Sequence, residues 1–305
     1  MGALTQSLRV SPYLLLILTT LFWSGNFVLG RAVREAVPPI ALSFWRWAVA
    51  LLILLPFVWP RLTAQWPLLK RHWRVLTGLA LLGVANFNTF VYIGLQTTTA
   101  TNALILISTA PVLIVALSFV ALGLTVSRRQ ALGIALSLAG VLVIVTRGDL
   151  AVLLALQFNR GDAWVFAAVL SWALYSVYLK WRPAGIDPLA FLAATIGIGV
   201  LLLTPVYLWD IVVSGARLAI NRVTVASVAY VAVFPSVLAY IFWNQAVAEL
   251  GANRTGQFLH LMPAFGAILS VLFLGEKLYL FHLTGIGLIA VGIYLTTGQT
   301  NSADR

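Results

Sequence analysis

Cysteine is absent from the 305 residues, and charged side chains make up only 9% of them. Without cysteine the chain has no disulfides, no thiolate metal site and no thiol nucleophile. With so few charges, and with 61% of its residues hydrophobic, it lacks the polar surface that keeps a soluble domain dissolved. The sequence therefore predicts a protein that lies in the lipid bilayer.

The hydrophobic residues form runs long enough to cross a bilayer. A membrane-spanning helix needs about 20 predominantly apolar residues. Ten such stretches occur, at residues 12–30, 40–58, 75–94, 98–121, 129–146, 162–181, 188–208, 225–245, 255–274 and 279–297. Mostly short loops are left between them, so we expect an all-α integral membrane protein with ten transmembrane helices.

Basic residues outnumber acidic ones by 19 to 8, which gives a formal charge of +11. They are spread through the short loops rather than gathered on one polar face, so the pattern fits membrane topology and not nucleic-acid binding. The loop between the second and third spans carries Arg61, Lys70, Arg71 and Arg74. Basic loops tend to stay in the cytoplasm. We therefore expect both termini there, in a multi-pass protein of the cell inner (plasma) membrane.

The second half of the chain repeats the first. A shift of 149 residues places the first two spans on the sixth and seventh, and a shift of 152 places the third to fifth on the eighth to tenth. The aligned pairs include Trp23 with Trp172, Pro56 with Pro205, Pro111 with Pro263, Gly133 with Gly285 and Gly140 with Gly292. Such matches of Trp, Pro and Gly indicate an internal duplication.

Five spans per repeat is an odd number, so the second repeat must enter the membrane from the opposite side. We expect a 5+5 inverted-topology repeat around a central cavity, with residues 1–149 as the first repeat and 150–305 as the second. Inverted repeats are typical of secondary transporters, whose site near the midplane opens to each side in turn. A duplication retained for stability alone is the alternative.

Several motifs resemble the EamA family of the drug/metabolite transporter (DMT) superfamily. They are FWSGNFV at 22–28, Pro39 with Phe44-Trp45-Arg46, and Pro263 with LGEKL at 274–278, His282, Gly285 and Gly292. The resemblance covers nearly the whole chain and implies a small-molecule transporter. Within the family the chain is most similar to the YddG-type exporters, which implies export of aromatic and other amino acids. The first repeat departs from the pattern, with Leu124 where the second has Glu276.

Polar and aromatic side chains within the spans are the candidate substrate contacts, because an unpaired polar group in lipid is costly and normally faces the bundle interior. Symmetry selects those at matching heights in both repeats. The candidate cavity residues are Trp23, Asn26, Asn88, Tyr92, Ser108, Trp172, Tyr175, Tyr240, Asn244, Gln257 and His260. Pro111 and Pro263 should break the fourth and ninth spans and act in gating. Interhelical hydrogen bonding is the alternative role for each polar residue.

Other residues in the spans are expected to be structural. Arg46 lies about two turns into the second span, where it could snorkel to the interface or pair with a loop carboxylate. Glu276 falls at a helix end beside Lys277. Glycines at heptad spacing in the fifth and tenth spans predict close packing, within the bundle or between protomers.

The candidate cavity residues suit a neutral or zwitterionic ligand with an apolar or aromatic part. No mid-span lysine is present to clamp a phosphate or sugar nucleotide. Together with the resemblance, this predicts an amino-acid exporter that works by alternating access, as a monomer or a homo-oligomer, without cofactor, metal or nucleic acid. Other small metabolites or drugs are the alternative substrates, and a channel is a further alternative. An intramembrane enzyme is remote, because all Asp and Glu lie in tails, loops or helix ends.

The expected orientation can be tested with reporter fusions. A fluorescent protein fused after residue 305 should fold in the cytoplasm, and alkaline phosphatase inserted in the loop at 147–161 should be active outside it. Active phosphatase fused at residue 305 would contradict the orientation.

Overall fold

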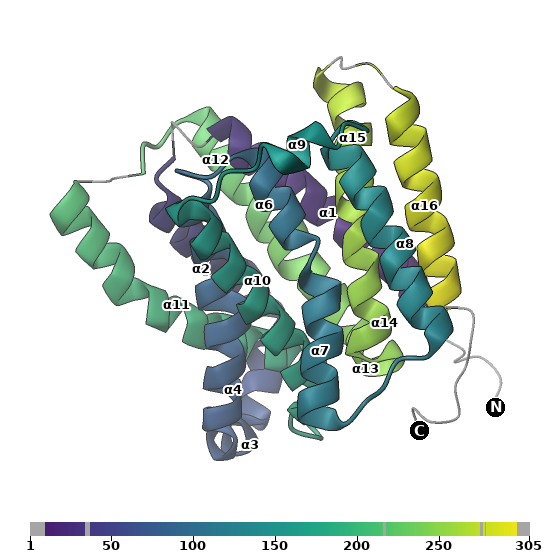
Figure 1. Cartoon of the computed structure of the whole chain (residues 1–305). Helices are drawn as coiled ribbons and strands as arrows, with labels where there is room; N and C mark the ends of the chain where they lie inside the picture. The colour runs from purple at the N-terminus through teal and green to yellow at the C-terminus, as the bar shows by residue number, and fades with distance from the viewer. Residues whose placement is uncertain (1–9, 34–36, 216–217, 275–276, 278, 298–305) are drawn as a thin grey trace.

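The computed structural model describes residues 10–33, 37–215, 218–274, 277 and 279–297, and nearly all of them are helical (Figure 1). Within those ranges there is no β-strand, and nine helical segments are long and apolar enough to cross a bilayer. The tenth expected span, 255–274, is divided into shorter helical pieces. Glu276 lies outside the described residues.

The first half of the chain consists of five spans. They are α1 (Pro12–Val33), α2 (Pro39–Ala64), α4 (Trp73–Ala80) with η1 (Leu81–Asn86) and α5 (Phe87–Gly94), α6 (Ala100–Ile107) with α7 (Ala110–Leu122), and α8 (Arg128–Val145). Two short helices lie in connections, α3 (Trp66–Arg71) and α9 (Ala151–Leu154).

The second half has the same plan. Its spans are α10 (Arg160–Tyr178) with η2 (Leu179–Trp181), α11 (Pro188–Ser214), α12 (Arg222–Val231) with η3 (Ala232–Leu238) and α13 (Ala239–Leu250), α14 (Ala252–Gln257) with η4 (Phe258–His260) and α15 (Leu261–Leu274), and α16 (Leu280–Thr297).

Local sequence explains where several helices begin. Ser127 and Gln130 form a reciprocal capping box at the start of α8, and Asn159 and Asp162 form another at the start of α10. Asp187 caps α11, where Pro188 takes the first helical position. These side chains satisfy backbone N–H groups that have no partner within the helix.

The two halves are irregular at matching positions. Both η1 and η3 are π-helical, and the shift of 152 residues carries 81–86 onto 233–238 within η3. The fourth and ninth spans are both interrupted just before their prolines, since α7 begins one residue before Pro111 and α15 two residues before Pro263. The expected helix breaks are therefore present in both spans.

The last span of each half packs against the other along a seam of glycines. A Cβ on Gly133 would lie 2.5 Å from the carbonyl oxygen of Gly292, and one on Gly140 would lie 2.6 Å from that of Gly285. The earlier residue of α8 meets the later residue of α16, so the helices run antiparallel. Gly133 corresponds to Gly285 in the repeat, and Gly140 corresponds to Gly292. Exchanging the two repeats therefore turns each of the two contacts into the other. Of the two expected alternatives, the described glycines thus pack within the chain, in an arrangement that has the symmetry of an inverted repeat.

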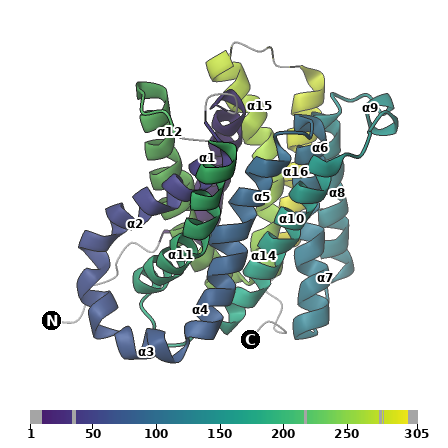
Figure 2. The same ribbon diagram turned by 90° about the vertical axis from the view of Figure 1, so that its left-hand side faces the viewer.

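Other interior contacts also join the two halves. α1 packs against α13, and α10 packs against α5 in the corresponding way. Figure 2 shows α2 and α11 at the opposite edge of the bundle from α8 and α16. Between these two edges lies the middle of the bundle, which both repeats build. We call the side where α1 begins and α16 ends the terminal side, and the other the far side.

The glycine seam predicts that Gly292→Ala destabilises the protein while Gly287→Ala, on the same helix, does not. A Cβ on Gly292 would lie 2.7 Å from the backbone nitrogen of Ser137, whereas one on Gly287 would meet nothing within 4 Å. Overpacking costs about 1–3 kcal/mol, and alanine is the better helix former where it fits. Thermal unfolding of the purified protein in detergent measures both, and equal midpoints would contradict the seam.

Candidate functional site

A small central chamber lies where the two halves meet. Its volume is about 20 Å³, which is room for about one water molecule. It is lined by Trp23, Asn26, Phe27, Phe87, Asn88, Ile107, Ala110, Val169, Trp172, Leu259 and Met262. The expected central cavity is therefore lined by both repeats, but in this conformation it is nearly closed.

Next to the chamber, the side chain of Arg46 is buried, with 1% of its surface exposed. Its Nη1 donates hydrogen bonds to Asn88 Oδ1 at 2.6 Å and to Tyr92 Oη at 2.7 Å, with a longer one to Asn26 Oδ1 at 3.4 Å. Its Nε donates to Ser236 Oγ at 2.9 Å. Tyr92 Oη in turn donates to Asn26 Oδ1 at 3.0 Å. This cluster, the Arg46 network, joins α1, α2, α5 and η3.

The expectation that Arg46 snorkels or pairs with a loop carboxylate is wrong. α2 turns this residue toward the bundle interior, where its partners are amide and hydroxyl oxygens, and it forms no ion pair with any described residue. In the structure Ser43, Trp47 and Ala50 are buried on the same face of α2, at the spacing of a helix that faces a core, but the sequence of this span is apolar on all sides and does not mark that face.

Aromatic rings close the chamber. Trp172 lies at their centre, with its ring centroid 4.9 Å from that of Trp23, 5.2 Å from Trp243 and 5.5 Å from Tyr240. Trp23 Nε1 donates to the carbonyl oxygen of Pro235 at 3.0 Å, and Tyr240 Oη donates to the carbonyl oxygen of Gly83. The rings contributed by one half are thus hydrogen-bonded to or packed against the other half. Trp243 was not among the expected residues, although it precedes Asn244.

A wider polar cavity opens toward the terminal side. This vestibule has a volume of about 650 Å³ and lies between the α7–α8 connection and the ends of α10 and α13. Lys180, Arg182 and Glu249 line it, together with Asn244 at its inner end. Asn244 Oδ1 accepts a hydrogen bond from Tyr175 Oη at 2.8 Å. Tyr175 packs on Trp172, so the vestibule ends against the aromatic cluster.

Of the eleven expected cavity residues, four line the chamber: Trp23, Asn26, Asn88 and Trp172. The surrounding contacts described above include Tyr92, Tyr175, Tyr240 and Asn244. The remaining three expected residues lie elsewhere. His260 is fully buried, with Nδ1 2.6 Å from Ser137 Oγ and Nε2 2.9 Å from the carbonyl oxygen of Ser108. The Ser108 hydroxyl donates to its own helix, at Leu104 O. Gln257 is buried too, and its amide makes no hydrogen bond to the described residues. For His260 and Ser108, the geometry fits the alternative role of tying helices together.

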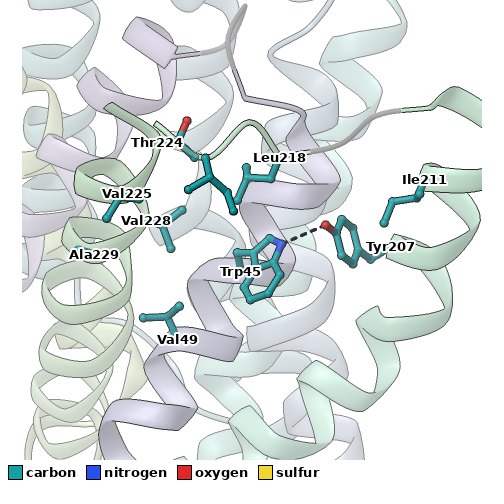
Figure 3. Close-up of a pocket in the computed structure, with 10 residues that line it drawn as sticks. Trp45, Val49, Tyr207, Ile211, Leu218, Thr224, Val225, Val228 and Ala229 are labelled. Carbon is teal, nitrogen blue, oxygen red and sulfur yellow. Dashed lines mark hydrogen bonds between the residues drawn. The ribbon is translucent and has the colours of Figure 1, made fainter. Parts of the chain in front are cut away.

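A third cavity, not expected from the sequence, lies at the edge of the bundle (Figure 3). Its volume is about 570 Å³, and α2, α11 and α12 surround it. The lining is almost wholly apolar, apart from Thr224 and a hydrogen bond from Trp45 Nε1 to Tyr207 Oη at 3.0 Å. Such a lining suits hydrocarbon rather than a charged or zwitterionic group.

The sequence pattern of the EamA-like transporter family matches this chain twice, over residues 10–146 and again over 159–298. The chain is 33% identical to an uncharacterized transporter of Archaeoglobus fulgidus, over 94% of this chain and 97% of that protein. It is 27% identical to the uncharacterized transporter YyaM of Bacillus subtilis, over 95% and 94% of the two chains. These matches confirm the resemblance to the family.

Two further relatives are informative. A protein of Streptantibioticus cattleyicolor named "Probable terminal-alkyne amino-acid exporter" is 28% identical over 93% of each chain. One solved crystal structure superposes with a TM-score of 0.74 over 94% of this chain and 96% of the other, at 18% sequence identity. That structure supports the fold alone.

The contacts of His260 predict a structural coupling with Ser137. His260→Leu and Ser137→Ala should each destabilise the protein, and the double variant should be about as unstable as His260→Leu alone, because both changes remove the same hydrogen bond. The coupling energy should be about 1 kcal/mol. Unfolding in detergent of the wild type and three variants measures it, and strictly additive losses would rule the coupling out.

Proposed function

This chain belongs to the EamA-like transporter family, and from that membership we propose that it exports amino acids by alternating access. The substrates are aromatic and other neutral amino acids, and the membrane is the cell inner (plasma) membrane. The observation that carries the proposal is the central chamber, in which aromatic rings from both repeats lie beside two uncharged amides, Asn26 and Asn88, of the first. Such a lining suits a zwitterion with an apolar side chain. The relative named as an amino-acid exporter supports the same substrate class.

Differences between equivalent positions support alternating access. On the far side, the Thr98 hydroxyl donates to Asp162, and a Cβ on Gly161 would lie 2.5 Å from the carbonyl oxygen of Gly94. The start of α10 therefore closes onto the end of α5. The repeat mate of Thr98 is Leu250, which lines the open terminal-side vestibule. The same position is thus closed in one repeat and open in the other.

In this proposal the repeats, 1–149 and 150–305, exchange these two conformations. The exchange would close the vestibule, which lies at the ends of α10 and α13, and open the equivalent space at the ends of α1 and α5, so that the chamber opens to the far side. Inverted repeats provide such a pair of states, because each half can adopt the shape of the other. The breaks before Pro111 and Pro263 are the expected bending points.

The lateral cavity favours a second candidate, export of apolar drug-like molecules. Its apolar lining of about 570 Å³ would hold a hydrophobic compound that entered from the lipid. Such molecules therefore belong in the same transport assay as the amino acids.

The proposal predicts substrate-specific uptake by proteoliposomes that contain the purified protein. Labelled neutral amino acids should enter faster than into empty liposomes, whereas nucleosides, sugars and organic cations should not. Trp172→Leu should lower the affinity about 5–30 fold, because it removes a wall of the chamber. Trp209→Leu changes an exposed tryptophan and is the matched control.

Uptake of no amino acid by wild-type protein of either orientation would refute the proposed substrates. Preferred uptake of hydrophobic compounds would support the second candidate instead. Equal uptake by Trp172→Leu and wild type would place the binding site outside the chamber.

A further inference from the structure

The charge of Arg46 has no counter-charge among the residues that the structure describes. A guanidinium is always protonated in proteins, and this one is buried in the middle of a membrane-spanning bundle. Every acceptor that it contacts is a neutral amide or hydroxyl oxygen. Asp162, the acidic residue buried at the start of α10, is already bonded to Thr98 and Asn102. A buried charge that is not paired is unfavourable, so a site of this kind attracts an anionic group.

The Arg46 network also fixes the orientation of the Asn88 side-chain amide beside the chamber. Asn88 turns its oxygen toward Arg46, so its buried Nδ2 faces the other way, on the side of the Tyr240 hydroxyl, where it makes no hydrogen bond of ordinary geometry to the described residues. The indole Nε1 of Trp172 is likewise buried without an acceptor. Both residues line the central chamber. Two residues of its wall therefore each carry a buried donor without a regular hydrogen bond to the described residues.

Two donors beside an uncompensated positive charge make a site for a group that only accepts hydrogen bonds and carries negative charge. A carboxylate has both properties. The ammonium group of a bound amino acid would face donors and a like charge at this place. It must therefore lie against another part of the chamber wall. The aromatic rings of Trp23 and Phe87, which line the same chamber, suit the apolar part of the ligand.

We propose that the central chamber binds the carboxylate of the transported molecule, with Asn88 and Trp172 as the donors and Arg46 as the charge that selects for it. Arg46 acts through Asn88, as a positioning residue, and does not line the chamber itself. The inference rests on the proposed function in that amino acids supply the carboxylate. In the present conformation the chamber is nearly closed, so binding requires the Trp172 ring to move from Trp23.

Matched ligands that differ only in the carboxylate test the proposal. Phenylalanine and phenylalaninol share the ring and the amine, but the second has a hydroxymethyl group instead. Each is used to inhibit uptake of a labelled amino acid into proteoliposomes. Wild-type protein should bind phenylalanine at least about tenfold more tightly, since hydrogen bonds to a charged group are the stronger class.

The variant Arg46→Gln should bring the ratio of the affinities for phenylalanine and phenylalaninol close to one, mainly by weakening the binding of phenylalanine. Arg222→Gln removes an exposed arginine at the start of α12 and should keep the wild-type ratio. Trp172→Phe retains a ring but lacks the indole donor, so it should weaken phenylalanine more than phenylalaninol. A role of Arg46 in folding alone would lower the amount of active protein without changing the ratio.

The outcomes separate this proposal from the proposed function. Equal inhibition by both ligands in the wild type, or an unchanged ratio in folded Arg46→Gln, would overturn the carboxylate site while leaving amino-acid transport in place. If Arg46→Gln does not fold, the affinity ratio of the wild type and the effect of Trp172→Phe on the two ligands test the carboxylate site instead. If no amino acid is transported, the proposed function fails. Thermal stabilisation by 3-phenylpropionate but not by 3-phenylpropanol would then still support the carboxylate site, and its absence would overturn it.

Discussion

A positive charge buried inside a lipid-surrounded bundle must be surrounded by hydrogen-bond acceptors from the protein itself, and Arg46 of α2 imposes this requirement on three other elements at once. Its hydrogen bonds reach Asn26 on α1, Asn88 and Tyr92 on α5, and Ser236 in η3. Ser236 belongs to the second repeat and the others to the first, so the charge holds the halves in register. The π-helical turn of η3 contributes, because the Ser236 hydroxyl donates to the carbonyl of Val231, five residues earlier.

The same region joins the halves through backbone groups. Gly83 and Pro235 are repeat mates within η1 and η3, and their carbonyl oxygens accept hydrogen bonds from Tyr240 and Trp23 of the opposite halves. π-Helical turns often mark functional sites, and here both lie beside the chamber. The glycine seam between α8 and α16 is different in kind, because backbone there touches backbone. We expect the seam to stay closed while the aromatic contacts at the chamber break and re-form.

The sequence predicted the features that proline and glycine impose locally. The spans, the breaks before Pro111 and Pro263 and the glycine pairs all follow from residues whose backbone or size constraints act wherever they occur. The π-helical turns were not predicted, since only Pro235 signals one and its mate is Gly83. Arg46 was misjudged because a span that is apolar on all sides gives little indication of which face turns inward, and its mate Thr195 is uncharged. The closure of the chamber depends on conformation, which the sequence does not specify.

The central claim is that the chamber between the halves is where the substrate sits. The natural absence of cysteine allows a direct measurement with a single introduced thiol. Ala110 lines the chamber and is buried, and Ala110→Cys changes the volume little. The rate at which a small water-soluble thiol reagent modifies Ala110→Cys in proteoliposomes should fall severalfold when a transported substrate is added at saturating concentration. A modification rate that no transported substrate alters would show that the substrate binds somewhere else.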